Sequence, residues 1–507
     1  MNYRPSGMKL WDTWYLNHQG EVHAFYMQGL APHSHRSAQE AGGIGHAVSR
    51  NLLDWKELPV ALLPGEAGSG EDLNIFTGCA AEKDGVLYLY YTQRASEDEG
   101  RTQQIGLATS RDFLHFEKYA GNPVITPDPS FLCTREAPAR YGIVDCRDLV
   151  VVQDPQGSGY VGFYASRRPS EEMPEGAVIV AVRSPDLVHW EHIGPVFTTT
   201  RHTIIEVPDV FFLEGRWYMT LLVNNDYGSR DLFQEQELVG GTIYAVSDSL
   251  PGPYAEEPDN IILASRRYNG ITCRSVAWMD RRYVLYVMTE RAGGIDSGGP
   301  DLGRLSSPKE YRVVNGKLRA VYADLLEEKL GPEQVTPSLL SQRQDGFRVL
   351  YETPGQWTLA QGAVTGQVRT CWSRYQLPLE AATFSFQARI RLTWGAAAGL
   401  VFCQRDGYSG YGAILDFKWQ KLLFCTMPRM ETVDCRAVSL TPGQTYHLRV
   451  MCYGIHYEVY LDDILLIQCV SYPFQGGHAG LLTDRANATF EGISFRSLEV
   501  EEAERND

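Results

Sequence analysis

The sequence predicts an all-β protein, a five-bladed β-propeller followed by a C-terminal β-sandwich. Three observations carry this prediction. The 507 residues include 28 Tyr, 19 Phe, 10 Trp and 48 Gly, a composition that favours short strands joined by tight turns. A short motif recurs five times before residue 291. From about residue 345 onward, alternating apolar segments are separated by Gly, Pro and Asp turns.

The recurring motif is a turn containing Gly or a charged residue, followed by an aromatic residue or His that opens an apolar strand. Its five copies are GEVHAFYMQ with His23, GVLYLYYTQ with Tyr88, GYVGFYAS with Tyr160, GRWYMTLLV with Tyr218 and DRRYVLYVM with Tyr283. The marker residues are separated by 65, 72, 58 and 65 residues. A unit of this length holds about four strands, which suits one propeller blade.

A second motif falls between the copies and supports the same repeat. It combines a Ser, an Asx, an apolar residue and an aromatic, and is typical of a turn that leads into a strand. Its copies are SRNLLDWKELPVAL from Ser49, SRDFLHFEKYAGNPVI from Ser110, SPDLVHWEHIGPVF from Ser184 and the weaker SDSLPGPYAE from Ser247. We therefore expect residues 1–305 to form the propeller.

The pattern changes after the propeller. Residues 306–344 are expected to be a connector, with a short helix at 321–330 (VYADLLEEKL) and a linker at PEQVTPS. Residues 345–500 are expected to form the sandwich. Its predicted strands lie in ATFSFQARIRLTW, AGLVFCQ, YGAILDFKW, YHLRVMCYG, HYEVYLDDILLIQCV and ATFEGISFRSLEV.

Composition excludes several classes of partner. Lys and Arg number 46 and Asp and Glu 62, for a net charge of −16, so no basic stripe is available for nucleic acid. No apolar run approaches the roughly 18 residues of a membrane helix, and the N-terminus lacks the pattern of a signal peptide. The ten cysteines include no Cys-x-x-Cys pair, which indicates a reducing cytoplasm and no metal site. No cofactor is expected, and homo-oligomerisation is left open.

Three acids are candidates for a shared site. Asp12 stands between two tryptophans just before the first repeated strand, while Asp148 (IVDCRDLVVV) and Glu206 (TIIEVPDVFFL) lie in apolar runs ahead of other copies. A buried ionised acid is costly unless it is paired or belongs to a site. Inner strands of a propeller converge on its axis, so these carboxylates are expected to meet in one pocket.

Paired carboxylates in one pocket are suited to glycoside cleavage, in which one attacks or activates water and the other protonates the leaving oxygen. Asp12 could be kept ionised by nearby donors. Glu206 has apolar neighbours in sequence, which suits the acid. Asp148, beside Arg147, is expected to stay charged and to hold sugar hydroxyls.

Several stretches resemble family 32 of the glycoside hydrolases, the invertase, inulinase and levanase group. They are LWDTWYLNHQGEVHAFYMQ, IGHAVSRNLLDWKELPVALLP, DLNIFTGCA, HFEKYAGNPVI, CRDL, IEVPDVFFLEG and, near the end, HYEVYLDD. The resemblance implies a retaining β-fructofuranosidase with Asp12 as nucleophile, Asp148 as transition-state stabiliser and Glu206 as acid/base. It also implies that Arg147 and Gln28 contact the sugar.

The sequence departs from the family pattern around these acids. The first block lacks the Asp-Pro-Asn-Gly turn, and its Trp-Asp-x-Trp form is closer to family 68, the levansucrases. Leu149 replaces a Pro, Val207 a Cys and Cys79 a Ser. The acids are kept while their surroundings differ. Trp11, Phe76 and Trp278 are further candidates, as apolar walls for a furanose ring.

The expected function is hydrolysis of terminal β-fructofuranosyl linkages in small fructosides, such as sucrose, fructo-oligosaccharides or a related fructose disaccharide. Three alternatives remain open at this point. They are a fructosyltransferase, an inverting furanosidase resembling family 43 (an arabinofuranosidase), and an inactive carbohydrate-binding propeller.

Overall fold

A computed structural model describes residues 1–29, 43–139, 142–157, 159–169, 176–202, 204–224, 238–267, 272–341, 355–405 and 409–500. These residues form two compact units. Unit 1 holds nearly all described residues up to Leu318. Unit 2 holds the short segments Ser265–Arg267 and Gly293–Gly299 and the described residues from Arg319 onward.

Within the described residues, unit 1 contains four separate antiparallel sheets, each named here by its hydrogen-bonded order. The first is β19-β20-β1-β2-β3-β4, with β19 Val287–Arg291, β20 Pro300–Leu305, β1 Lys9–His18, β2 Glu21–Gly29, β3 Gly43–Ser49 and β4 Lys56–Leu62. The second is β5-β6-β7-β8, with β5 Asn74–Lys83, β6 Val86–Arg94, β7 Gln103–Ser110 and β8 Glu117–Lys118. The third is β9-β10-β11-β12, with β9 Cys146–Gln153, β10 Tyr160–Arg167, β11 Ala177–Ser184 and β12 Glu191–Thr198. The fourth is β13-β14-β15-β16, with β13 Glu206–Leu213, β14 Arg216–Asn224, β15 Gly240–Ser247 and β16 Ala255–Ser265.

The two sequence motifs mark fixed places in these sheets. The aromatic or His marker lies on β2, β6, β10 and β14, each the second of four strands that follow one another along the chain in its sheet. The Ser of the other motif ends the third strand at Ser49, Ser110, Ser184 and Ser247. In the turn that follows Ser110, Asp112 Oδ1 accepts the backbone N–H groups of Leu114 (2.9 Å) and His115 (2.8 Å). Asn51 and Asp186 do the same in their turns, so the Asx side chain fixes the turn that starts the fourth strand.

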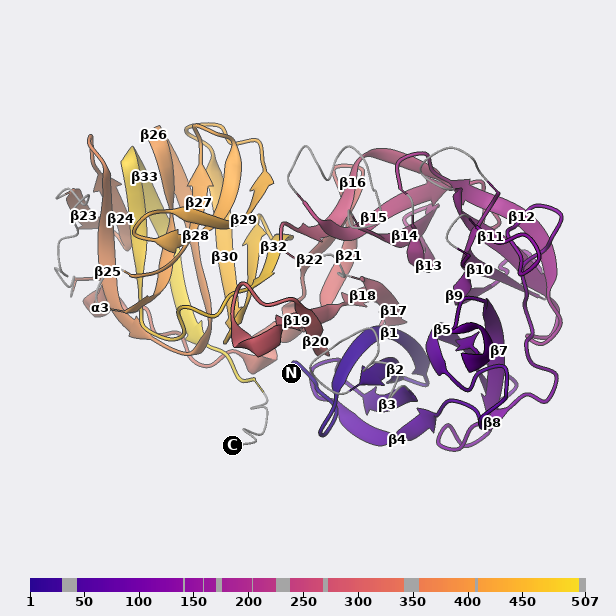
Figure 1. Cartoon of the computed structure of the whole chain (residues 1–507). Coiled ribbons are helices and arrows are strands. Elements are labelled where there is room, and N and C mark those ends of the chain that lie inside the picture. Colours follow the sequence, from indigo (N-terminus) through magenta and orange to yellow (C-terminus); the bar gives the residue numbers. More distant parts are fainter. Residues whose placement is uncertain are drawn as a thin grey trace. The chain divides into compact units, whose positions relative to one another are not determined.

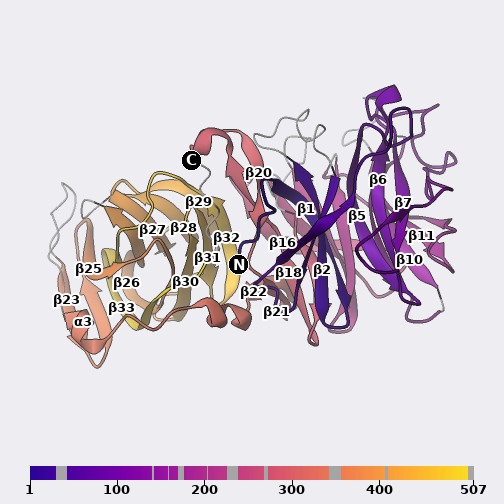
Figure 2. The same cartoon turned by 90° about the horizontal axis from the view of Figure 1, so that it is seen from below.

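The sheets are arranged as propeller blades. Figure 1 shows β1, β5, β9, β13 and β17 (Arg274–Trp278) around the middle of unit 1, while β4, β8, β12 and β16 lie at its periphery. Figure 2 shows the strands of the first two sheets from a perpendicular direction. The all-β, propeller-like fold is therefore confirmed.

The predicted number of five separate blades is wrong: four sheets stand alone. The fifth copy of the motif lies on β18 Arg281–Leu285, which belongs to a fifteen-stranded sheet together with β17, β21 Lys309–Val314 and β22 Lys317–Tyr322. Of these strands, β21 and β22 lie in the segment expected to be the connector. The physical reason is the end of β22, where Val321 pairs with Ile464 of β32 inside unit 2.

The connector contains little helix. The segment expected to be helical at 321–330 begins with the end of β22 and continues as a 3₁₀ helix, η4 Asp324–Lys329. One α-helical turn follows, α3 Pro337–Ser341. Elsewhere in the described part of the chain, short 3₁₀ helices occur at η1 Ser96–Asp98 and η3 Ala292–Gly294. No helix among the described residues is long and apolar enough to cross a membrane.

Unit 2 is the predicted β-sandwich. Its strands are β23 Gln356–Ala360, β24 Ala363–Gln367, β25 Trp372–Glu380, β26 Thr383–Arg405, β27 Ser409–Asp416, β28 Lys421–Met427, β29 Glu431–Ala437, β30 Thr445–Tyr453, β31 His456–Leu461, β32 Ile464–Val470 and β33 His478–Ser497. Two predicted strands merge into β26. Its first part pairs with β30 and its second part with β27, while β33 pairs with both parts. The long strands β26 and β33 therefore run through both layers.

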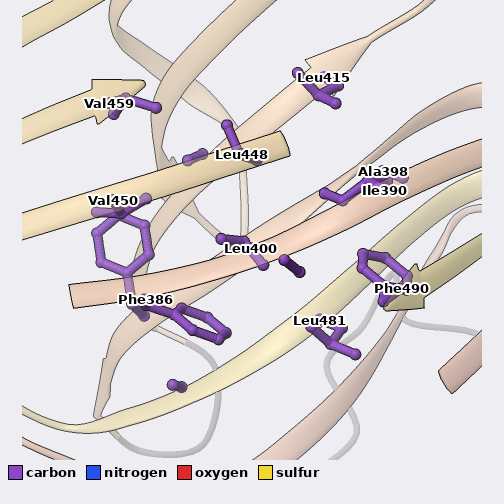
Figure 3. Close-up of a cluster of buried hydrophobic side chains, with 14 of the residues drawn as sticks. Phe386, Ile390, Ala398, Leu400, Leu415, Leu448, Val450, Val459, Leu481 and Phe490 are labelled. Carbon is purple, nitrogen blue, oxygen red and sulfur yellow. The ribbon is translucent and has the colours of Figure 1, made fainter. Parts of the chain in front are cut away.

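The core of unit 2 lies between these layers. Figure 3 shows Phe386, Ile390 and Leu400 of β26 together with Leu448 of β30 and Phe490 of β33, all of them fully buried. Alternating apolar residues on both inner faces account for this packing.

Candidate active site

Four of the five inner strands of unit 1 share a local irregularity at one end. Each of β1, β5, β9 and β13 contains a β-bulge near its first residues. The bulges lie between Leu10 and Thr13, between Phe76 and Cys79, at Asp148 and Leu149, and between Glu206 and Asp209. An added residue bends a strand and redirects its side chains, as is common beside active sites.

Backbone dihedrals confirm the distortion at two of the bulges. Asp148 has φ 61° and Val207 has φ 49°, both in the left-handed region that non-glycine residues rarely adopt. Such strain persists only where the surroundings enforce it, and it concentrates at functional sites. The three candidate acids lie in or at the edge of these bulges.

Asp12 is buried and only partly satisfied. The Thr77 hydroxyl donates to its Oδ2 at 2.7 Å. The buried Oδ1 makes no hydrogen bond with the described residues, although Thr272 is near enough to lower the pKa. Burial raises the pKa of Asp12 to about 6, Thr77 and Arg274 lower it, and the carboxylate of Glu206 raises it further. Oδ1 is therefore a carboxylate oxygen with unused lone pairs.

Asp148 is also buried, and its Oδ2 accepts the backbone N–H of Val207 at 3.0 Å. Arg147 Nε lies 3.5 Å from the same oxygen. Burial raises the pKa of Asp148 to about 7; Arg147 opposes this shift, and Glu206 and Asp12 reinforce it. Contrary to the sequence-based expectation, proximity to Arg147 does not keep Asp148 permanently charged, because burial outweighs one contact at 3.5 Å.

Glu206 is the most accessible of the three acids, with a side chain 27% exposed. Its Oε1 accepts a hydrogen bond from Arg147 Nη2 at 2.9 Å. Its sequence neighbours Ile205 and Val207 are apolar and buried, yet the carboxyl group itself contacts an arginine. The side chain turns to the arginine because β13 is bulged directly after it.

The three carboxylates form one electrostatic group. Asp12 and Asp148 each respond to the charge of Glu206, and Asp148 also responds to Asp12. Arg147 contacts Glu206 and Asp148 directly, and their charges with that of Asp145 raise its own pKa. The sequence prediction that these acids share one pocket is consistent with this coupling.

Two neighbours of this group were missed by the sequence reasoning. Asp145 is 5% exposed and bridges two arginines: it accepts from Arg147 Nη1 and, at 2.8 Å, from Arg167 Nε. These arginines lower the pKa of Asp145 against the effect of burial. Thr77 is the second. Asp145 precedes Arg147 by two residues in VDCRD, so a second acid beside Arg147 and Asp148 was the sequence signal that could have identified it.

The remaining sequence candidates divide into two groups. Trp11 lies in the β1 bulge beside Asp12, Gln28 is opposite Leu10 on β2, and Phe76 starts the β5 bulge. One face of the Phe76 ring is covered by the guanidinium of Arg94, 4.6 Å from its centroid. These three residues are at the same end of the strands as Asp12.

Trp278 is not part of this group. It is 4% exposed, packs on Tyr283, and donates from Nε1 to the carbonyl of Gly20 at 3.0 Å. Gly20 is in the β1–β2 turn, eight residues beyond Asp12, or roughly 26 Å along an extended strand. The role expected for Trp278 as a wall of the sugar pocket is therefore wrong, because the residue ends β17 at the far side.

Two features of this group bear on the chemistry it allows. The described residues contain no group of three His, Cys, Asp or Glu side chains arranged to hold a metal ion. The site offers instead a buried carboxylate, a second coupled carboxylate and an accessible carboxyl held by an arginine. This set can attack a carbon, stabilise positive charge and move a proton.

Several known proteins are similar to this chain. The model of the "Glycosyl hydrolases family 32 N-terminal domain" matches residues 14–249. A levanase of Bacillus subtilis (strain 168) is 40% identical over 239 residues, covering 44% of this chain and 30% of the levanase. A sucrose-6-phosphate hydrolase of Zymomonas mobilis is 30% identical over 213 residues, covering 39% of this chain and 38% of that enzyme. The alignments thus span less than two fifths of these curated relatives.

Solved structures resemble the chain over nearly its full length. A GH32 β-fructofuranosidase of Bombyx mori superposes with a TM-score of 0.66 at 16% identity, covering 98% of this chain and 94% of that one. An exo-inulinase from Aspergillus awamori gives 0.69 at 16% identity, covering 98% and 97%. At this identity the likeness supports the fold, a propeller-like domain with a C-terminal sandwich. Residues 14–249 therefore resemble the N-terminal domain of glycosyl hydrolases family 32.

Proposed function

We propose that this protein is a retaining glycoside hydrolase that releases fructose from small β-fructofuranosides. The observation that carries the proposal is the coupled set of Asp12, Asp148 and Glu206 on bulged inner strands, with Arg147 between the latter two. The names of the similar proteins support the class of substrate. One solved structure of the Bombyx mori enzyme is a mutant in complex with sucrose.

In the proposed first step, Asp12 Oδ1 attacks the anomeric carbon of the fructosyl group as the glycosidic C–O bond breaks. Glu206 gives its proton to the departing oxygen, which leaves as an alcohol. Asp148 binds sugar hydroxyls and stabilises the positive charge that develops on the ring. The products are the free leaving group and a fructosyl ester of Asp12.

In the second step, Glu206 takes a proton from water, whose oxygen attacks the same carbon from the side vacated by the leaving group. The ester bond to Asp12 breaks and fructose leaves with its original anomeric configuration. Arg147 Nη2 donates to Glu206 Oε1 at 2.9 Å and so holds this side chain in place through both steps. Trp11, Gln28 and Phe76 are proposed to contact the sugar.

A time course by NMR over a panel of fructosides and arabinosides tests this proposal. We expect β-fructofuranose as the first product from sucrose or a short fructo-oligosaccharide, and no turnover by the Asp12→Asn variant. Initial formation of the α-anomer would indicate inversion and overturn the assignment. Growth of longer oligosaccharides would indicate transfer, release of arabinose would change the substrate, and binding without release would indicate an inactive propeller.

We also propose the domain division expected from the sequence: a catalytic domain at 1–305, a connector at 306–344 and a sandwich at 345–500. The division near Leu318 into two compact units supports it. A cytoplasmic location is proposed as well, supported by ten free cysteines, nine of them buried. Fractionation of the producing cell would test that location.

A further inference from the structure

One buried cation in unit 1 lies close to the catalytic group without belonging to it. Arg274, the first residue of β17, is 3% exposed. It lines a cavity of about 300 Å³ whose walls include Trp14 of β1, Cys79 of β5, Val151 of β9 and Asp209 of β13. Because all five strands contribute to this one cavity, Arg274 lies where the inner strands converge.

The guanidinium of Arg274 binds the backbones of two different bulges. Nη2 donates to the carbonyl of Gly78 at 2.7 Å, and Nη1 donates to the carbonyl of Pro208. Gly78 adjoins Thr77, the donor to Asp12, in the β5 bulge. Pro208 lies two residues after Glu206 in the β13 bulge.

The Gly78 bulge has little freedom of its own. A Cβ at Gly78 would lie 2.0 Å from the carbonyl oxygen of Tyr90, so only glycine fits there. The redirected carbonyl of this bulge needs a donor other than the strand ladder, and Arg274 supplies it. A planar guanidinium can bind two carbonyls at once, whereas an ammonium is a single point of attachment.

From these contacts we infer that Arg274 is a positioning residue. It joins the β5 bulge, whose Thr77 donates to Asp12, to the β13 bulge, which directly follows Glu206, and so sets the separation of the Asp12 and Glu206 carboxyl groups. The inference rests on the proposed function for its consequence in turnover. The structural part of the inference, that Arg274 holds the two bulges together, does not depend on any substrate. The positive charge has a second effect, since it lowers the pKa of Asp12.

Two substitutions separate geometry from charge. Arg274→Lys keeps a positive charge and loses the fork, while Arg274→Met loses both. We expect each variant to lower kcat, by about tenfold for lysine and about a hundredfold for methionine, with a smaller change in KM. Only Arg274→Met should move the acidic limb of the kcat/KM profile upward, by about one pH unit.

Hydrogen exchange of the full-length protein supplies a readout that needs no activity. Peptides covering 76–80 and 206–210 should exchange at least about tenfold faster in both variants than in the wild type. The matched control is Arg496→Met, which removes a similar clamp on the carbonyls of Gly331 and Leu330 within unit 2. It should leave both peptides and kcat unchanged.

The outcomes are distinguishable. If the wild type releases no fructose from any fructoside, the proposed function fails, and exchange alone decides the role of Arg274. Unchanged exchange at both peptides in both variants would overturn the inference, as would an equal acceleration in the Arg496→Met control. If Arg274→Met does not fold, Arg274→Lys still decides: normal kcat with normal exchange would refute the role.

Discussion

Removing the Thr77 hydroxyl should raise the pKa of Asp12 and thereby shift the pH dependence of catalysis. Thr77→Val keeps the shape of the side chain and deletes the donor that lies 2.7 Å from Asp12 Oδ2. A hydrogen bond to a charged group contributes about 1.5–3 kcal/mol, and one pKa unit corresponds to about 1.4 kcal/mol. Loss of the bond should therefore move the pKa of Asp12 upward by about one to two units.

The wild-type pKa of Asp12 is about 6, so half of the enzyme carries the ionised nucleophile at pH 6. A pKa of about 7 in Thr77→Val leaves roughly one tenth ionised at that pH, a fall of about fivefold in kcat/KM. The two enzymes should converge above about pH 8, where Asp12 is ionised in both. The acidic limb reports the coupled carboxylates together, so its midpoint belongs to the group.

The assay is the initial rate of fructose release between about pH 4.5 and 9, with Thr77→Ser as the control. Serine keeps the hydroxyl and should keep the wild-type profile. A Thr77→Val profile that superimposes on the wild type would refute the reasoning. A uniform loss of kcat/KM at every pH, with the acidic limb unmoved, would show that Thr77 acts through packing and not through the charge on Asp12.

Three further predictions concern stability and the neighbours of the site. Asp12→Asn, which stops turnover in the proposed mechanism, should raise the free energy of unfolding at pH 8 by about 3 kcal/mol. The Asp12 carboxyl has a folded-state pKa of about 6 against an ordinary 3.8, so it destabilises the folded state as pH rises through that window. Urea unfolding at pH 8 and below pH 4 checks this. An equal gain in the free energy of unfolding at both pH values would contradict it. Asp145→Asn should lower the free energy of unfolding by about 3 kcal/mol and reduce kcat, because Arg147 and Arg167 lose their shared counter-charge. An Asp145→Asn variant with wild-type unfolding and wild-type kcat would contradict this. Trp278→Ala should lower the free energy of unfolding by about 3 kcal/mol and leave kcat/KM of the folded enzyme within about twofold of the wild type, since the ring packs far from Asp12. A large loss of kcat/KM in a stably folded variant would show that Trp278 does belong to the site.

Much of the fold could be predicted from the sequence because its repeat has a direct physical cause. The markers His23 and Tyr88 open the second strand of their sheets, and Asp112 fixes a turn through its own side chain. Local rules of this kind are visible in a single sequence. The number of separate sheets is not, because it depends on the pairing of Val321 with Ile464, 143 positions apart.

The three acids could likewise be predicted, since charged residues inside apolar strands stand out. Their electrostatic environments could not. Asp148 is adjacent to Arg147 in sequence, yet burial raises its pKa to about 7, and Glu206 has apolar sequence neighbours but faces an arginine. Both outcomes depend on bulges, and a bulge changes where a side chain points without leaving a signal in the pattern of apolar residues.

The four bulges also separate two demands on the inner strands. A strand normally ties every side chain to its neighbours by strict alternation, so a change of direction at one residue reverses all that follow. In β1, β5, β9 and β13 the added residue absorbs that reversal near the start of the strand. Residues before the bulge can therefore be replaced to change what the site binds, while the apolar alternation after it keeps the blades packed. Deletion of Val207 should lower the free energy of unfolding far more than most substitutions of Val207 do, because it restores alternation with the wrong phase.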